Sequence, residues 1–266
     1  MRISHVQNYQ NNNKYSQHTF GAWSRDVYKT DKSGFYQTLL HRNNTCFFRD
    51  DSFWVSLTNF LEKKYARTSK VNVYCYGCSD GSEPYSFVMQ AMSKGDKFVK
   101  KFLPINASDY DTVAIEKAKE NKYCIRPREY HNIKECTGID PAYFFKFPFR
   151  IANYFQLEKY NASLQEKVVK NVKYSVKDIL EDYKNIEKDN SVILARNFWP
   201  YIEDSSKRMK FFNDLYNHLG KNSFLVIGNF DNTNPDIAQE IMRAGFKRIN
   251  NNTFEKYGPS SKKINL

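Results

Sequence analysis

The sequence predicts an α/β fold in which helices cover a doubly wound, mainly parallel sheet. Two observations predict it. From about residue 71 onward, short apolar and β-branched runs alternate with segments of helical spacing, which is typical of parallel strands joined by crossover helices. Polar residues and glycines follow several of these runs, and ligands bind at this edge of such sheets.

The residues ahead of this pattern predict a polar tail and a short helical region. Residues 1–20 are rich in Asn, Gln, Tyr and Ser, and we expect them to be poorly ordered or weakly docked. Aromatic and aliphatic residues between positions 23 and 40 indicate short helices. Asp51–Tyr65 indicates a longer helix, because its large apolar residues share one face: Phe53, Trp54, Leu57, Phe60 and Leu61.

Five strands, which alternate with helices along most of the chain, make up the predicted sheet. The strands are Val71–Tyr76, Leu103–Ala107, Val168–Tyr174, Ser191–Ala195 and Ser223–Gly228. The helices are Glu83–Met92, about Asp111–Glu120, Asp204–Leu219 and Pro235–Ala244, and the segment Ser175–Asp182 follows the third strand. The basic segment Lys94–Lys101 is expected to be a surface loop. A hairpin of Phe246–Ile249 and Thr253–Tyr257 would add antiparallel strands at one edge.

The expected domains are a polar tail with a short helical region, residues 1–66, and a sheet domain, residues 67–266. Residues 122–168 interrupt the pattern with aromatic, Pro-containing sequence and indicate an inserted subdomain of the sheet domain.

The chain carries a net charge of +12 and has a pI of about 9.3. This charge indicates an acidic partner, for which a protein segment is favoured over nucleic acid. The alternative is that lysine and asparagine are simply abundant in this chain. No run approaches the roughly 18 apolar residues of a membrane helix and the N-terminus is polar, so we expect a cytoplasmic protein without membrane insertion.

The five cysteines do not form a disulfide or zinc pattern. Cys75 and Cys78 have the C-x-x-C spacing of a redox pair, but a strand residue followed by a loop residue is the favoured interpretation. None of the five histidines has metal-ligand spacing, and no metal site is expected.

A glycine-containing loop lies between the first predicted strand and its helix. Gly77 and Gly81 allow sharp turns and a close approach to a ligand, because they lack a Cβ atom. The loop leads to a helix N-terminus, which favours negative charge. Glu83 in the first helical turn would repel a pyrophosphate. It suits a ligand with a cationic end, such as the amino group and sulfonium of S-adenosylmethionine.

Asp109 follows the second predicted strand, where a carboxylate can accept hydrogen bonds from both ribose hydroxyls. The alternative is that Asp109 is the N-cap of the following helix. Beside the glycine loop, ribose binding is favoured.

Five runs, in the same order along the chain, resemble the CheR-type chemotaxis receptor methyltransferases. They are residues 43–50 (NNTCFFRD), 77–86 (GCSDGSEPYS), 107–111 (ASDYD), 172–180 (VKYSVKDIL) and 195–201 (ARNFWPY). The resemblance implies the class I methyltransferase fold, which is Rossmann-like. It also implies S-adenosylmethionine as cofactor, with S-adenosylhomocysteine as product, and a protein glutamate as acceptor, for which a chemoreceptor cytoplasmic domain is a candidate.

The resemblance also implies roles for single residues. Cofactor contacts are implied for Asn43, Thr45, Arg49, Gly77, Glu83, Asp109, Asp178, Ile179, Arg196 and Asn197. Among these, Glu83 would bind the methionine end and Asp109 the ribose, while Asp178 and Ile179 would flank the adenine.

Arg49 and Tyr201 are the catalytic candidates, and would orient the acceptor. Because a carboxylate is already ionised at pH 7, its attack on the methyl carbon requires no strong base. The alternatives are a surface ion pair of Arg49 with Asp50 or Asp51, and an ordinary half-buried tyrosine at position 201. Phe47 and Phe48 are expected to be core residues.

Some positions depart from the family's pattern. Residues 228–231 (GNFD) replace a Gly-His-Ser-Glu-like run, and the insertion 122–168 contains a single glycine. The alternatives for function are therefore another methyl acceptor on the same fold, including an amide or nucleic acid, and a non-catalytic scaffold that binds S-adenosylmethionine.

Overall fold

The computed structural model describes residues 28–30, 36–38, 45–147 and 160–257. These residues fall into two units, one within residues 1–46 and the other within residues 47–266. In the first unit, β1 (Tyr28–Thr30) and β2 (Tyr36–Thr38) form an antiparallel pair in which Tyr28 lies opposite Thr38. The short helices predicted here are thus wrong for these six residues. Tyrosine and threonine favour the pleated backbone of a strand, and the rest of the predicted region lies outside the described residues.

A seven-stranded sheet forms the centre of the second unit. Its order is β11-β12-β10-β9-β3-β4-β8, with β3 (Asn72–Tyr76), β4 (Ile105–Asp109), β8 (Val172–Val176), β9 (Ser191–Ala195), β10 (Phe224–Val226), β11 (Lys247–Arg248) and β12 (Thr253–Glu255). The five strands from β10 to β8 are parallel, and β11 and β12 add the predicted antiparallel edge. The chain proceeds outward from β3 to β8 and then returns to β9, so the direction of winding reverses between β3 and β9.

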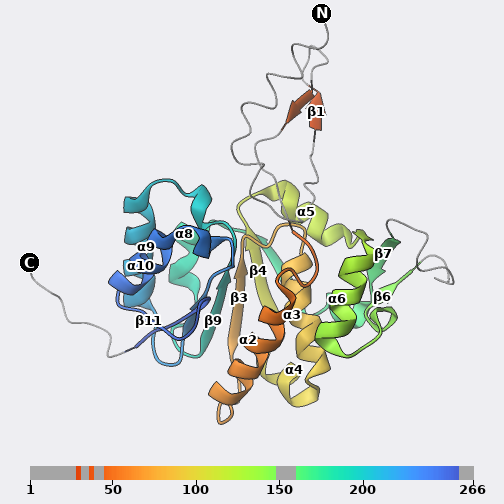
Figure 1. Cartoon of the computed structure of the whole chain (residues 1–266), viewed down its shortest axis with the longest axis horizontal. Coiled ribbons are helices and arrows are strands. Elements are labelled where there is room, and N and C mark those ends of the chain that lie inside the picture. The colour runs from red at the N-terminus through yellow and green to blue at the C-terminus, as the bar shows by residue number, and fades with distance from the viewer. Residues whose placement is uncertain (1–27, 31–35, 39–44, 148–159, 258–266) are drawn as a thin grey trace, which may run out of the picture. The chain divides into compact units, whose positions relative to one another are not determined.

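Helices cover both faces of this sheet (Figure 1). One core contains residues of α2 (Asp51–Lys64), α3 (Ser82–Ser93), α4 (Asp96–Phe102) and α5 (Thr112–Glu120). The other contains residues of α8 (Ile179–Asp182), α9 (Ser205–His218) and α10 (Pro235–Arg243). Strand β9 serves both cores, because Val192 and Leu194 belong to the first while Ile193 and Ala195 belong to the second. This alternation explains why β9 is apolar on both faces.

The inserted segment forms a small antiparallel sheet of order β5-β7-β6. Its elements are β5 (Tyr123–Ile125), α6 (Pro127–Thr137), β6 (Phe145–Lys146) and β7 (Tyr160–Leu164), with the 3-10 helix η1 (Pro141–Tyr143). Phe144 and Phe145 are buried in the first core, so the insertion is anchored by its own aromatic residues. The predicted division of the chain at residues 66/67 stays a prediction.

Two predicted elements differ from the structure. The predicted surface loop Lys94–Lys101 is wrong, because α4 occupies most of it. Phe98 and Phe102, four residues apart, are both buried, and this apolar spacing stabilises the helix despite its lysines. The third strand begins at Val172 instead of Val168, because residues 166–169 form the short helix α7 (Glu166–Val169).

Among the helices of the described ranges, none has the length and apolar character needed to cross a bilayer.

Candidate active site

The loop between β3 and α3 turns through three residues with left-handed backbone. Gly77, Ser79 and Gly81 have φ angles of 66°, 51° and 88°. A Cβ atom on Gly77 would lie 2.8 Å from the ring of Phe198, and one on Gly81 would clash with the hydroxyl of Tyr174. Both glycines are therefore required by conformation and by space, and the loop packs closely against the residues after β9.

Asp109 ties this loop to the end of β4. One carboxylate oxygen, Oδ2, accepts from the main-chain N–H of Ser79 at 2.9 Å, and Oδ1 accepts from the N–H of Asp111 at 3.0 Å. Burial raises the pKa of Asp109, although the hydrogen bonds from Asp111 and Ser79 counteract it. The alternative that Asp109 caps the next helix is wrong, because Asp111 caps α5 through the N–H of Val113.

A buried arginine joins three segments that lie far apart in the sequence. The side chain of Arg196, just after β9, is 0% exposed. Its guanidinium donates to Glu83 Oε2 at 3.1 Å and to Asp50 Oδ2 at 3.0 Å. The guanidinium carbon lies 4.1 Å from the ring centre of Phe53 and 4.8 Å from that of Trp54, which adds cation–π stabilisation.

Two carboxylates and two guanidinium groups make up the charges near this site. Asp50 and Glu83 both pair with Arg196, and Arg49 acts on Glu83 as a second positive charge. Burial raises the pKa of Glu83, while the positive charges of Arg196 and Arg49 oppose this shift. The carboxylate of Glu83 is the group of this cluster that could bind the cationic end of a ligand.

Asn197 and Asp231 connect the loops that follow β9 and β10. Oδ2 of Asp231 accepts from the main-chain N–H groups of Asn197 and Gly228, both at 2.7 Å, and Oδ1 accepts from the N–H of Trp199 at 3.1 Å. Asn197 has a φ angle of 65°, and its Oδ1 accepts from the N–H of Phe230 at 3.1 Å. Its Nδ2 is buried and has no hydrogen-bond partner within the described part of the chain.

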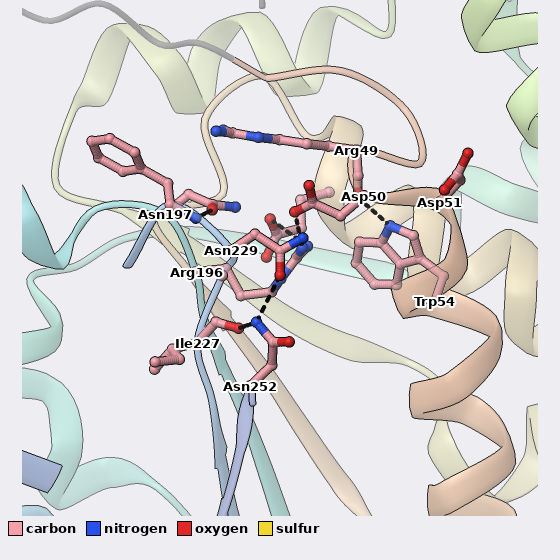
Figure 2. A network of polar contacts seen from close by, with 12 residues as sticks. Arg49, Asp50, Asp51, Trp54, Arg196, Asn197, Ile227, Asn229 and Asn252 are labelled. Carbon is pink, nitrogen blue, oxygen red and sulfur yellow. Dashed lines mark hydrogen bonds and ion pairs between the residues drawn. The ribbon is translucent and has the colours of Figure 1, made fainter. Parts of the chain in front are cut away.

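Arg49 lies in the loop that enters α2. The indole N–H of Trp54 donates to the main-chain oxygen of Arg49 at 2.9 Å, and Figure 2 shows the Arg49 side chain extended from this loop toward the loop of Asn197. The residues on either side, Phe48 and Asp50, have φ angles of 50° and 60°. Residues other than glycine rarely adopt this left-handed backbone conformation, and such backbone strain is common at functional sites.

Tyr201 lies in the 3-10 helix η3 (Trp199–Tyr201) and is 54% exposed. Its ring packs against Phe230 with 5.5 Å between ring centres. The two aromatic side chains form a surface beside the loop of Asn197.

The other predicted site residues are less closely connected. Asn43 lies outside the described residues, and Thr45 belongs to the first unit. Asp178 is exposed and caps α8 through the N–H of Leu180, while Ile179 is buried in the second core. The charge of Asp178 acts on Tyr110, the neighbour of Asp109, so the ends of β4 and β8 lie close together.

Two residues of the network were not predicted as site residues. The sequence suggests Asp50 only as an alternative ion-pair partner of Arg49, but Asp50 pairs with Arg196. Asp231 lies in the run that departs from the family's pattern. Its position, five residues after the end of the buried strand β10, is a signal that could have identified it.

The C-x-x-C alternative finds no support in the structure. None of the five cysteines forms a disulfide, and Cys75 and Cys78 are buried. Burial raises the pKa of both thiols, whereas a redox pair requires a low-pKa thiol. Within the described ranges, no group of three or more His, Cys, Asp or Glu residues could hold a metal ion.

Comparison with known proteins identifies relatives of the chain. Residues 43–244 match the family described as CheR methyltransferase, SAM binding domain. A chemotaxis protein methyltransferase of Borreliella burgdorferi is 24% identical over 214 residues, covering 77% of this chain and 70% of the relative.

Solved structures with a similar fold are more distant in sequence. The N-methyltransferase NodS of Bradyrhizobium japonicum has a TM-score of 0.38 and 11% identity, covering 77% of this chain and 96% of NodS. A ribosomal protein L11 methylase of Lactobacillus delbrueckii subsp. bulgaricus has a TM-score of 0.36 and 11% identity, covering 77% of each chain.

The site described above fits S-adenosylmethionine. The carboxylate of Glu83 could bind a cationic end, and the carboxylate of Asp109 lies at the edge of the sheet where a nucleoside would bind. The buried, unpartnered Nδ2 of Asn197 offers a donor that a ligand could satisfy. With a family match over most of its length, the chain belongs to the CheR methyltransferases and is an S-adenosylmethionine-dependent methyltransferase of that type.

Proposed function

We propose that this enzyme methylates the carboxylate of glutamate side chains in an acidic protein, with a chemoreceptor cytoplasmic domain as the candidate substrate. Bound S-adenosylmethionine supplies an electrophilic methyl group on a sulfonium. A glutamate oxygen forms the new bond to the methyl carbon as the carbon–sulfur bond breaks, giving a methyl ester and S-adenosylhomocysteine. We further propose that this occurs in the cytoplasm.

The observation that carries this proposal is the position of Arg49. Its main chain is held by Trp54, and its side chain extends toward the loop of Asn197 (Figure 2). A guanidinium there can bind an acceptor carboxylate through two parallel N–H bonds. The Arg49 charge also acts on Glu83, so Arg49 is near the proposed cofactor site.

The protonation chemistry supports an acceptor that is already ionised. Asp109 and Asp231 are buried and accept two and three main-chain hydrogen bonds, so neither is free to remove a proton. His131 lies on α6, and His218, at the end of α9, contacts the main-chain oxygen of Ile186. A carboxylate needs no base; positioning and desolvation would lower the barrier.

We propose the cofactor contacts that the family resemblance implies, and the positions of Glu83 and Asp109 support them. Glu83 would bind the amino group of the methionine end and Asp109 the ribose hydroxyls. Asp178 and Ile179 would flank the adenine, and Gly77 would allow a close approach of the main chain. Arg49, Arg196 and Asn197 complete the proposed set. Arg196 would act mainly by holding Glu83, because its guanidinium is buried between two carboxylates.

The test is methyl transfer to peptides that contain glutamate, with base-labile methyl ester as the product measured. Arg49→Lys keeps the charge but loses the two-pronged geometry, and should lower kcat/KM by roughly tenfold or more. Tyr201→Phe removes the hydroxyl and keeps the ring, so it distinguishes the contributions of these two groups to methyl transfer. Methyl groups found only on amide nitrogen, or on nucleic acid, would contradict the proposed acceptor.

A further inference from the structure

A cavity of about 430 Å³ lies between α2, the loop after β10 and the turn that joins β11 to β12. The residues that line it are four asparagines, two serines, one threonine, Phe53 and Leu57. None of these lining residues is charged. Such a surface offers hydrogen bonds without attracting ions, and neither the cofactor nor the acceptor carboxylate has been assigned to it.

Two of the asparagines hold each other in a fixed orientation. Nδ2 of Asn252 donates to the main-chain oxygen of Ile227 and to Oδ1 of Asn229, both at 3.1 Å (Figure 2). Because a main-chain carbonyl can only accept, this contact determines which side-chain atom of Asn252 is nitrogen. Both Nδ2 hydrogens of Asn252 are therefore used, and its Oδ1 stays an acceptor. Asn229 likewise keeps its Nδ2 as a donor.

The opposite wall comes from the first two turns of α2. Ser52 and Ser56 are exposed and four residues apart, so their hydroxyls lie on one face of the helix. Phe53 and Leu57 have the same spacing and contribute the apolar part of the lining. The cavity thus combines a donor, an acceptor, two hydroxyls and an apolar patch.

The cavity shares structure with the candidate active site. The ring of Phe53 that lines it also packs on the guanidinium of Arg196, at 4.1 Å. Asn229 follows Gly228, which lies so close to the Asn197 amide that a Cβ atom would clash with it. A molecule in the cavity is therefore separated from the Arg196–Glu83 pair by one aromatic ring.

We propose that this cavity binds main-chain peptide groups of the acceptor protein beside the glutamate that is methylated, an inference that rests on the proposed function. A peptide group presents one C=O acceptor and one N–H donor, which match the donor Nδ2 of Asn229 and the acceptor Oδ1 of Asn252. An anionic group is disfavoured, because none of the lining residues is a cation that could pair with it. The cavity recognises the backbone, and the acceptor carboxylate is held elsewhere by Arg49.

Two blocked peptides test this proposal. N-acetyl-trialanine-N-methylamide is neutral and offers only peptide groups, while N-acetyl-Ala-Glu-Ala-N-methylamide adds the acceptor carboxylate. Their dissociation constants for the complex of the enzyme with S-adenosylhomocysteine are measured by NMR titration. Methyl ester formation on the second peptide gives kcat and KM.

Two variants alter the cavity from opposite walls. Asn229→Asp replaces the donor by an acceptor, and Ser56→Leu fills space from an exposed helical position. Each should weaken binding of the neutral peptide by roughly tenfold and raise KM for the glutamate peptide, with S-adenosylhomocysteine affinity unchanged. Asn213→Asp, on the exposed face of α9, makes the same charge change away from the cavity and should have no effect.

The outcomes separate the two proposals. If the neutral peptide fails to bind the wild type, or binds it and both cavity variants equally, the cavity proposal is wrong. An ester formed with the same KM in all variants would overturn the cavity proposal and leave the proposed function standing. Cavity-dependent binding without any ester would overturn the glutamate acceptor and leave peptide binding standing.

Discussion

The guanidinium of Arg196 donates to the carboxylate of Glu83 at 3.1 Å, across 113 positions of sequence. This pair fixes the first turn of α3 to the end of β9, on either side of the point where the winding of the sheet reverses. Asp50 completes the arrangement from the loop before α2 at 3.0 Å. One buried side chain thus positions three segments of the candidate active site.

Arg196→Lys should show how far the affinity for the cofactor product depends on the position of Glu83, apart from any effect on protein stability. Lysine keeps the charge but cannot donate to two carboxylates in the planar geometry of a guanidinium, so we expect a loss of roughly 1–3 kcal/mol in unfolding free energy. Because Glu83 is then misplaced, affinity for S-adenosylhomocysteine should fall at least tenfold. Calorimetric titration of the folded variant measures this.

Arg208→Lys is the matched control. Arg208 is also buried and pairs with Glu240, at 2.7 Å and 2.8 Å, between α9 and α10. Its substitution should lower stability by a similar amount without changing the affinity of the remaining folded protein. Equal affinity losses in both variants would show that the Arg196 effect is only loss of stability.

Asp109→Ala should abolish micromolar binding of S-adenosylhomocysteine. It removes the acceptor for the N–H of Ser79 as well as the proposed ribose contact, so we expect affinity to fall by roughly a hundredfold. Asp111→Ala removes the cap of α5 and should cost about 1 kcal/mol of stability with affinity retained. Unchanged binding by Asp109→Ala would exclude the ribose role.

The order of strands and helices could be predicted because each element carries a strong local pattern. The apolar run of β9 and the glycine loop after β3 are examples, and both lie where the sequence indicates. The sequence does not predict the helix α4, because five lysine and aspartate residues in and beside it obscure the spacing of Phe98 and Phe102. That helix is stabilised by burial of two rings, which is a tertiary effect.

The polar network of the site could be predicted only in part. Glu83 and Arg196 lie in recognisable runs, but nothing in either run indicates that they pair with each other. Asp50 pairs with Arg196, 146 positions away, from a loop whose left-handed backbone at Phe48 and Asp50 has no local sequence signal. Such partners depend on loop conformation, which local residue patterns do not determine.

Asp231→Asn should change how the stability of the protein depends on pH, because it removes a buried carboxyl group. Burial raises the pKa of Asp231 to about 7, against about 3.9 in an unfolded chain. A carboxyl group whose pKa is higher in the folded than in the unfolded state stabilises the folded protein while it is protonated. This contribution to the unfolding free energy is fully present below about pH 4, and it is lost as pH rises toward 7, at about 1.4 kcal/mol per pH unit. Asparagine at this position does not titrate. Its Nδ2 would face a main-chain N–H donor, which should lower the unfolding free energy by about 1–3 kcal/mol at every pH.

The stability difference between wild type and Asp231→Asn should therefore narrow as pH rises from 4 to 7. Urea unfolding at pH 4.5, 5.5 and 6.5 measures it, with Asp236→Asn, an exposed residue of α10, as the control for losing one negative charge. A difference that widens with pH would mean that the three N–H donors keep Asp231 ionised throughout.

Trp54→Phe should impair catalysis more than cofactor binding. The change keeps a ring beside Arg196 but removes the indole N–H that donates to the main-chain oxygen of Arg49. Without that bond, the strained loop between Phe48 and Asp50 can relax and Arg49 is no longer held toward the acceptor. We expect kcat to fall severalfold to tenfold, stability to fall by about 1 kcal/mol, and S-adenosylhomocysteine affinity to change little.

Thr58→Val is the matched control, because it removes another buried hydrogen bond of α2, from Oγ1 to the main-chain oxygen of Trp54 at 3.0 Å. It should lower stability by a similar amount and leave kcat unchanged. If both variants lower kcat equally, α2 acts as a rigid body and the Trp54–Arg49 bond has no separate role. If only Trp54→Phe lowers kcat, the position of Arg49 limits methyl transfer.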